Sequence, residues 1–263
     1  MRLRRIGLIS NFLVVHMGLR LFILILFFYP VFVGASLAFT EEEIQRFQTL
    51  LMERPIGERI AFWAEKFVGT PYDQDPLGEY VSKAAIVADD RVDCMYLTFR
   101  TVELSISHTP AEAVEVALDK RFHTKGILKG SKVMNYEDRF EYGEDMISSG
   151  KWGREITGDI GNTSRIKGSR GKDFVDILLT NELYRNMEKL KSGDIVFFIK
   201  KPVERKVGEI VGHIGILKVE QDQEVYLIHA SGTKERGGMV KKVLLKEYVL
   251  QMPFIGVKIN RMH

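Results

Sequence analysis

GHIGILKVEQDQEVYLIHAS, residues 212–231 of this 263-residue chain, has the pattern of a β-hairpin. Two runs rich in apolar residues, 214–219 and 225–228, flank the polar connection 220–224. Short runs of this composition, separated by a polar turn, are typical of paired antiparallel strands. The segment therefore predicts a sheet in the second half of the chain.

The hairpin would bring two histidines to the same end of the sheet. If the connection centres on Gln221, His213 and His229 face each other directly, because their numbers are symmetric about 221. If it centres on Asp222, they are diagonal neighbours with Cα atoms roughly 7 Å apart. Both registers allow the imidazoles to touch on one face of the sheet. The alternative is that the two histidines are unrelated strand residues near solvent.

The rest of the chain divides into a helical half and a β half. Further β-type runs lie at residues 195–199, 240–244 and 255–259, separated by polar or glycine-containing turns. Capping residues and helical spacing predict helices at about 40–52, at 57–67, at about 94–106 and from Thr109 onward. Residues 123–175 fit neither period and predict an elaborated insertion. The chain is therefore expected to be an α+β protein with an antiparallel sheet.

Cys94 is the only cysteine, so no intramolecular disulfide can form. It lies in the segment 91–95, where a helix is expected to begin. A free cysteine is commonly a small buried hydrophobe. At a helix N-terminus, however, the helix dipole and a nearby imidazolium both favour the thiolate, and free N–H groups can stabilise an oxyanion. These residues predict Cys94 as nucleophile, His213 as general base and then acid, and His229 as the group that orients it.

The N-terminus has the pattern of an export signal. Basic residues at positions 2, 4 and 5 precede the apolar run 21–34, and small residues end at Ala38. Translation could equally start at Met17. The apolar run is shorter than the roughly 20 residues that a bilayer span needs, so an uncleaved anchor is the weaker alternative. We expect residues 1–38 to be a signal peptide and the protein to act in the periplasm or outside the cell.

Cleavage also changes the charge of the chain. It would remove four arginines and no acidic residue, which changes the formal net charge from +3 to 3 − 4 = −1. The mature chain of 263 − 38 = 225 residues then has no overall basic excess that favours nucleic acid. Only local clusters such as residues 200–206 could provide a basic surface.

Several motifs follow one another in an order that resembles a known superfamily. They are Gly69-Thr70-Pro71-Tyr72, Asp93-Cys94, Ser192 to Phe198, Gly212 to Ile216 and Ile228-His229-Ala230. Over about residues 60–261 the chain resembles the NlpC/P60 papain-like cysteine peptidases and amidases of bacterial cell walls. More narrowly, it looks like the exported N-acetylmuramoyl-L-alanine amidase-like branch, formerly a domain of unknown function, DUF1460. The residues that carry this narrower likeness are Asp93-Cys94-Met95, Tyr136-Glu137-Asp138-Arg139 and His229-Ala230-Ser231.

This resemblance implies a papain-like α+β fold in a single domain, residues 39–263. The helix that bears the nucleophilic cysteine would pack on the antiparallel sheet that bears the histidines. The resemblance implies the same catalytic roles for Cys94, His213 and His229, and no cofactor or metal. It also places Tyr72 near the thiol as a substrate or oxyanion contact.

Two departures from the superfamily limit how far specificity can be transferred. Cys94 and His213 are 213 − 94 = 119 positions apart, many more than in compact members. Met95 and Tyr96 also replace the small residues that usually follow the nucleophile.

Four residues outside the triad are candidates for substrate binding. Tyr72 either contacts substrate or packs as a turn tyrosine, and Asp93 either contacts substrate or caps the helix that follows. Arg139 offers a planar fork to a peptide carboxylate, although such charges are often simply solvated. Trp152 is the better of the two tryptophans for stacking on a sugar, because Trp63 lies on an amphipathic helix.

Three classes of function fit this sequence. The favoured one is an exported cysteine amidohydrolase of peptidoglycan or muropeptides. It would cut either the bond between N-acetylmuramic acid and L-alanine or the γ-D-glutamyl bond to the diamino acid. The second is a zinc site of Cys94, His213 and His229, for which the sequence offers no fourth ligand. The third is a non-catalytic module that binds the cell wall. The sequence assigns no oligomeric state.

Overall fold

The computed structural model describes residues 39–205 and 208–263, which belong to one compact unit. The expected signal peptide, residues 1–38, lies outside the described residues. Within the described ranges, no helix is both long enough and apolar enough to cross a bilayer.

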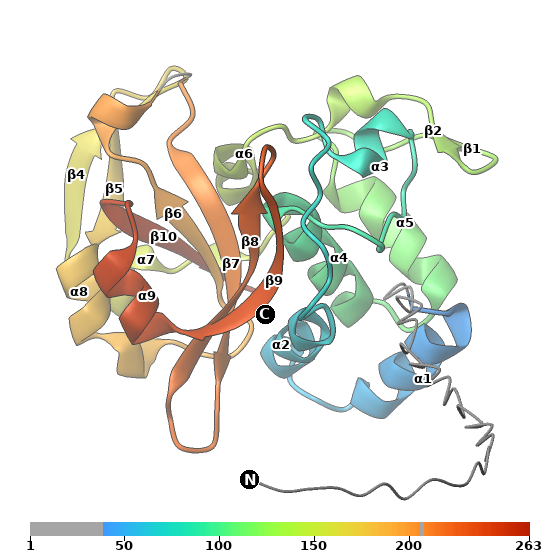
Figure 1. The fold of residues 1–263 in the computed structure, drawn as a ribbon, viewed down its shortest axis with the longest axis horizontal. Helices are drawn as coiled ribbons and strands as arrows, with labels where there is room; N and C mark the ends of the chain where they lie inside the picture. The colour runs from blue at the N-terminus through green and yellow to red at the C-terminus, as the bar shows by residue number, and fades with distance from the viewer. Residues whose placement is uncertain (1–38, 206–207) are drawn as a thin grey trace, which may run out of the picture. The chain divides into compact units, whose positions relative to one another are not determined.

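The sheet predicted from the hairpin pattern is present and antiparallel (Figure 1). Its strands are β3 (Arg154–Glu155), β4 (Thr163–Lys167), β5 (Phe174–Leu179), β6 (Ile195–Ile199), β7 (Val211–Val219), β8 (Val225–Thr233), β9 (Gly237–Leu244) and β10 (Gly256–Arg261). They are ordered β4-β5-β10-β6-β7-β8-β9, and β3 also pairs with β10. A separate hairpin consists of β1 (Leu128–Lys129) and β2 (Lys132–Val133).

The described residues form helices in both halves of the chain, and three of these helices begin at a capping side chain. They are α1 (Glu41–Leu51), α2 (Ile56–Lys66), α3 (Glu79–Ser82), α4 (Cys94–Ile106), α5 (Pro110–Lys120), α6 (Gly143–Ser149), α7 (Thr157–Ile160), α8 (Thr180–Arg185) and α9 (Leu245–Gln251). Short 3-10 turns lie at η1 (Tyr136–Asp138), η2 (Met187–Lys189) and η3 (Pro202–Glu204). Thr40 and Glu43 form a reciprocal capping box on α1, and Thr109 caps α5 ahead of Pro110. The predicted α+β class is therefore confirmed.

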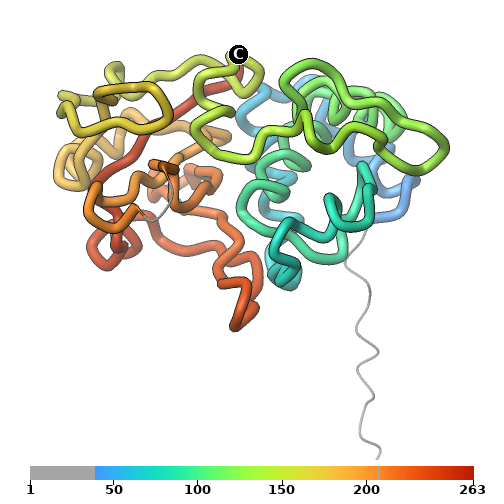
Figure 2. The backbone as a smooth tube through the Cα atoms, turned by 90° about the horizontal axis from the view of Figure 1, so that it is seen from above, coloured from blue at the N-terminus to red at the C-terminus, as the bar shows by residue number. Residues whose placement is uncertain are grey.

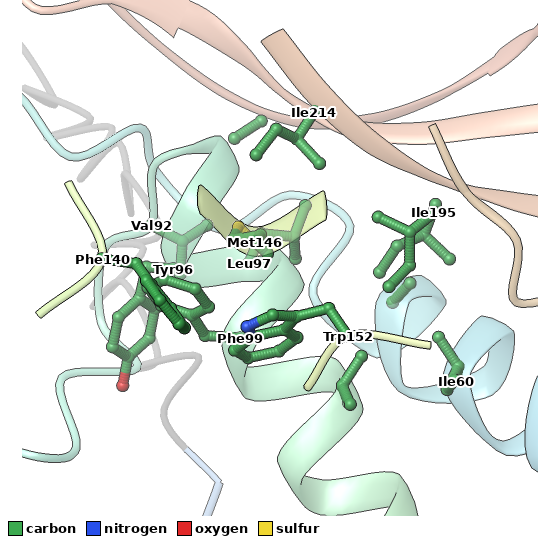
Figure 3. Packing of buried hydrophobic residues seen from close by; sticks show 14 of the residues in the cluster. Ile60, Val92, Tyr96, Leu97, Phe99, Phe140, Met146, Trp152, Ile195 and Ile214 are labelled. Atoms are coloured by element: carbon green, nitrogen blue, oxygen red, sulfur yellow. The ribbon is translucent and has the colours of Figure 1, made fainter. Parts of the chain in front are cut away.

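The central strand β6 is buried on both faces and separates two hydrophobic cores. Phe197 faces the core that α2 and α4 share with the sheet, whereas Phe198 faces the core under α7, α8 and α9. This alternation follows from the two-residue period of a strand. α4 is buried along most of its length, and Leu97 and Phe99 pack in the first core (Figure 3). Because a buried leucine or phenylalanine contributes roughly 1.5–3 kcal/mol, α4 is a rigid support for its first residue, Cys94.

Residues 123–175, expected to form an insertion, contain short elements rather than one long irregular loop. They include the β1–β2 hairpin, α6 and α7. They also include β4, which with β5 extends the main sheet and was not predicted. β4 is an edge strand whose side chains are exposed or only half-buried. Ile166 is the one apolar residue in Thr163–Lys167, so the segment lacks the apolar run that marks a core strand.

Candidate active site

The register of the β7–β8 hairpin places the two histidines in contact. Ile216 lies opposite Ile228, so the hairpin centres on Asp222 and adopts the diagonal alternative. His213 Nε2 and His229 Nδ1 are 2.7 Å apart, which is hydrogen-bonding distance. The interpretation that these are two unrelated histidines near solvent is therefore wrong, whereas the expected imidazole contact is confirmed.

A β-bulge directly before His213 sets the course of the strand there. The register between β6 and β7 shifts between Phe198 and Ile199, which leaves Gly212 as the extra residue of β7. A Cβ atom on Gly212 would lie 2.6 Å from the Phe254 ring, so the close approach requires glycine. Bulges next to active sites commonly re-aim a neighbouring side chain, and here that side chain is the proposed base.

Aromatic rings pack against both imidazoles, of which His229 is buried and His213 is half-buried. The His213 ring stacks on Phe198 and Phe254 with centroids 5.8 Å and 6.4 Å away, and the His229 ring meets Tyr248 at 5.0 Å. This burial is the main cause that lowers the pKa of His213 to about 3 and the pKa of His229 to about 4. Both imidazoles are therefore neutral at neutral pH, which is the form that a general base needs.

The contact between the histidines constrains their tautomers. A neutral imidazole has one donor nitrogen and one acceptor nitrogen. If Nδ1 of His213 is to accept a proton, its own hydrogen must be on Nε2, which then donates to His229 Nδ1. His229 accepts this hydrogen bond before and after His213 gains a proton. It can therefore orient the base throughout a reaction.

Cys94 lies at the start of α4, against β7. Asp93 caps the helix by accepting the Tyr96 N–H on Oδ1 at 2.8 Å, which confirms the capping interpretation of Asp93. The backbone N–H of Ile214 acts on the Cys94 thiol and lowers its pKa, in opposition to the larger effect of burial. Because Ile214 follows His213 in the chain and α4 contacts β7, the thiol lies beside the strand that carries the histidine.

The protonation state of Cys94 differs from the thiolate that its position at the start of a helix predicts. Burial raises the pKa of Cys94 to about 12, and the carboxylates of Asp93 and Glu209 add to the rise. The Ile214 N–H and the Lys234 ammonium act in the opposite direction but do not outweigh it. Cys94 therefore keeps its proton at neutral pH and must transfer it to a base in order to act as a nucleophile.

Two charged pairs beside Cys94 were not predicted from the sequence. Glu209 pairs with Lys200 at 2.8 Å on the connection before β7, and Lys234 pairs with Asp93 at 3.3 Å from the β8–β9 turn. Glu209 and Lys234 both act on the pKa of Cys94, so both belong to the site. These residues stand on loops far from Cys94 in the sequence and match no motif, so no sequence signal identified them.

Tyr72 lies close to the thiol and is held by the β8–β9 hairpin. Its ring packs over Gly232, where a Cβ atom would lie only 2.6 Å from it. Lys234 Nζ lies 5.7 Å from the ring centroid. Burial, followed by the influence of Cys94, raises the pKa of Tyr72 well above its usual value. The Tyr72 hydroxyl is therefore a hydrogen-bond donor at neutral pH.

The other two substrate-binding candidates lie in the insertion. Trp152 is wrong as a sugar platform, because it is fully buried and packs 4.9 Å from Phe99 (Figure 3). Arg139 has 17% of its side chain exposed and is paired with Glu141 at 2.9 Å and with the Tyr136 carbonyl at 3.0 Å. These contacts tie Arg139 into the insertion, and its role in substrate binding stays a prediction.

The contact between His213 and His229 also argues against the alternative in which these histidines and Cys94 bind zinc. His213 Nε2 and His229 Nδ1 face each other, so these two nitrogens cannot bind an ion while their hydrogen bond is made. Among residues 39–205 and 208–263, no group of three or more His, Cys, Asp or Glu side chains is arranged to hold a metal ion.

The buried histidines predict that the protein is destabilised by acid. Unfolded, they take up protons near pH 6.5, whereas in the folded protein their pKa values are about 3 and about 4. Below pH 6.5 the unfolded state therefore binds more protons, and the free energy of unfolding falls by up to about 1.4 kcal/mol per pH unit for each histidine. We expect a smaller fall in a His229→Asn variant. Urea unfolding at about pH 7.5 and about pH 5 measures this, and equal falls in both proteins would contradict it.

Solved structures share this fold. An N-acetylmuramoyl-L-alanine amidase from Bacteroides uniformis matches 79% of this chain with 98% of its own, at a TM-score of 0.61 and 20% sequence identity. A Legionella pneumophila protein of the DUF1460 family matches 83% of this chain with 93% of its own, at a TM-score of 0.62 and 15% identity. No family profile and no curated protein matches the sequence. The resemblance to the DUF1460, amidase-like proteins is thus confirmed in the fold, and the NlpC/P60 assignment stays a prediction.

Proposed function

We propose that this protein is an exported, cysteine-dependent amidase that cuts the bond between N-acetylmuramic acid and L-alanine in peptidoglycan or muropeptides. One observation carries the proposal. The only cysteine begins α4, which contacts the strand β7 that carries His213, and His213 in turn contacts His229 at 2.7 Å. The choice of bond is supported by the fold shared with the N-acetylmuramoyl-L-alanine amidase from Bacteroides uniformis.

The reaction we propose needs only the three residues and water. His213 Nδ1 takes the proton of Cys94 as the sulfur attacks the muramoyl carbonyl carbon, so that a C–S bond forms and the carbonyl π electrons move to oxygen. The intermediate collapses, the C–N bond breaks, and His213 gives its proton to the leaving L-alanine amine. His213 then deprotonates a water molecule that attacks the thioester, which releases the muramic acid product and restores the thiol.

The raised pKa of the thiol makes the base indispensable in this scheme. A cysteine that keeps its proton until pH values near its pKa of about 12 has almost no thiolate at neutral pH. Proton transfer to His213 must therefore accompany attack. The neutral imidazole of His213 is ready to receive that proton, and His229 keeps its ring in place.

Two sets of donors could stabilise the oxyanion. The first N–H groups of α4, at Cys94 and Met95, have no partner within the helix, as at any helix N-terminus. The N–H of Tyr96 is already taken by Asp93. The Tyr72 hydroxyl is the second donor, because it is protonated and lies near the thiol. One such donor contributes on the order of 3 kcal/mol in enzymes where it has been removed.

Mass spectrometry of the reaction products tests the proposal. The exported protein is incubated with defined muropeptides under reducing conditions, beside its Cys94→Ala variant. We expect free stem peptide that begins with L-alanine, formed by the unmodified protein alone. L-Ala-γ-D-Glu as the product would overturn the assigned bond and identify a γ-D-glutamyl-diamino acid endopeptidase. Absence of any cleavage by a correctly folded protein would instead favour a non-catalytic wall-binding module.

A further inference from the structure

The β1–β2 hairpin projects from the helical half of the unit (Figures 1 and 2). Its strands pair Leu128 with Val133 and Lys129 with Lys132. Gly130, with φ of 62°, and Ser131 form the tight turn between them. The hairpin is therefore a small, fully hydrogen-bonded feature rather than a loose loop.

The two faces of this hairpin differ. Val133, on the face of the Leu128 pair, is only 4% exposed. The next pair toward the base of the hairpin is joined by the bond from the Met134 N–H to the Ile127 carbonyl at 2.8 Å, and these residues are 59% (Ile127) and 58% (Met134) exposed. Because side chains alternate along a strand and partners share a face, the outward face carries four exposed residues. They are Ile127, Lys129, Lys132 and Met134.

The two lysines of the outward face are unbalanced charges. Lys129 and Lys132 are directly opposite each other, which destabilises a strand pair. Across the described part of the chain, neither lysine has an acidic partner. Residues 120–135 contain no aspartate or glutamate at all. The stability of the hairpin therefore does not explain this pair of cations, which an anionic surface outside the protein would complement.

The outward face is presented rigidly. Asn135 accepts the Ile127 N–H at 2.7 Å and donates to the Lys125 carbonyl at 3.0 Å, which closes the base of the hairpin. The Val133 N–H donates to the Ala84 carbonyl at 2.8 Å and ties β2 to the body. Little conformational entropy is therefore lost when this face meets a partner.

We propose that the outward face of the β1–β2 hairpin docks on an anionic lipid bilayer. Ile127 and Met134 would enter the boundary between head groups and acyl chains, and Lys129 and Lys132 would contact lipid phosphates. The cations select a negative surface. The exposed apolar side chains of Ile127 and Met134 favour a bilayer over a polar polymer such as the cell wall. Only the bilayer has an apolar layer, the acyl chains, beneath its charged head groups.

Vesicle binding tests this proposal without any assay of hydrolysis. The exported protein, recovered from cells that express the full chain, is sedimented with phosphatidylcholine vesicles that contain about 30 mol% phosphatidylglycerol, and with vesicles of phosphatidylcholine alone. We expect binding to the anionic vesicles that falls about tenfold in a Lys129→Gln/Lys132→Gln variant and about tenfold in an Ile127→Ser/Met134→Ser variant. Every variant carries the same N-terminus, so differences among them report on the hairpin.

A matched control separates the hairpin from general surface hydrophobicity. Val203 and Leu250 are 92% (Val203) and 73% (Leu250) exposed and lie outside the hairpin, so their replacement by serine should leave vesicle binding unchanged. Equal binding by all variants, or equal binding to neutral vesicles, would overturn the proposal. So would binding to wall sacculi in place of vesicles. Cleavage of soluble muropeptides should be unchanged in both hairpin variants, so failure here and failure of the proposed amidase activity are distinguishable.

Discussion

We expect a Cys94→Ser protein to release stem peptide from muropeptides at least about 10⁴-fold more slowly than the unmodified protein. A serine hydroxyl is far less acidic than a thiol. The site disfavours an anion at this position, since burial together with Asp93 and Glu209 already raises the pKa of Cys94 to about 12. His213, whose pKa is lowered by burial, takes a proton from a hydroxyl less readily than from the more acidic thiol.

Initial rates of stem-peptide release, followed by mass spectrometry, measure this effect. Urea unfolding serves as the control for folding, because exchanging one sulfur for oxygen should change the free energy of unfolding by less than about 1 kcal/mol.

A Cys94→Ser/His213→Ala double variant should be no slower than Cys94→Ser alone, because the effects of residues that act as a unit are not additive. His229→Asn should retain more activity than His229→Ala, because only its amide oxygen can accept the His213 Nε2–H. A Cys94→Ser protein with more than about 1% of the original rate would disprove the nucleophile assignment.

The largest expected effect on stability is at Arg121, in the buried core beneath α4. Arg121 donates from Nε and Nη2 to the two carboxylate oxygens of Glu103, both at 2.6 Å, and from Nη1 to the Ile86 carbonyl at 2.8 Å. Both side chains are at most 1% exposed. An Arg121→Met substitution leaves the Glu103 carboxylate buried without its cation. We expect it to lower the free energy of unfolding by about 3–5 kcal/mol.

Urea unfolding of three proteins measures this and supplies its controls. An Arg121→Met/Glu103→Leu double variant should recover most of the loss, because no unpaired charge remains buried. Arg165 pairs with Asp176 on the exposed edge of the sheet, with exposed fractions of 68% and 52%, so Arg165→Ala should change stability by less than about 1 kcal/mol. A loss below about 1 kcal/mol for Arg121→Met would show that the buried pair is not needed to neutralise Glu103.

The parts of the fold that could be predicted are those with strong local periodicity. The hairpin of residues 212–231 and the helix after Asp93 each combine an apolar period with a recognisable boundary. The two possible registers of the hairpin could not be separated, because the connection 220–224 has no turn motif that fixes its centre. The structure shows that Gln223 takes a positive φ of 66°, which is a property of the folded turn.

The parts that could not be predicted depend on tertiary contacts. Trp152 looked suited to a surface role because charged Lys151 and flexible Gly153 flank it, yet its ring fills the core against Phe99. The thiolate form of Cys94 was predicted from the helix dipole and a neighbouring imidazolium. Desolvation and the carboxylate of Glu209, which lies 115 positions away in the chain (209 − 94), reverse that prediction.

Cys94 lies on α4 and both histidines lie on the sheet, and this separation determines when during folding the catalytic groups come together. The thiol meets the base only after the helical half and the sheet have packed together. A chain that has formed its helices and its hairpin, but has not yet docked them, holds no working centre. If the proposed activity is correct, a polypeptide that crosses the membrane unfolded is harmless in transit. It becomes an active amidase only after it has folded completely outside the membrane.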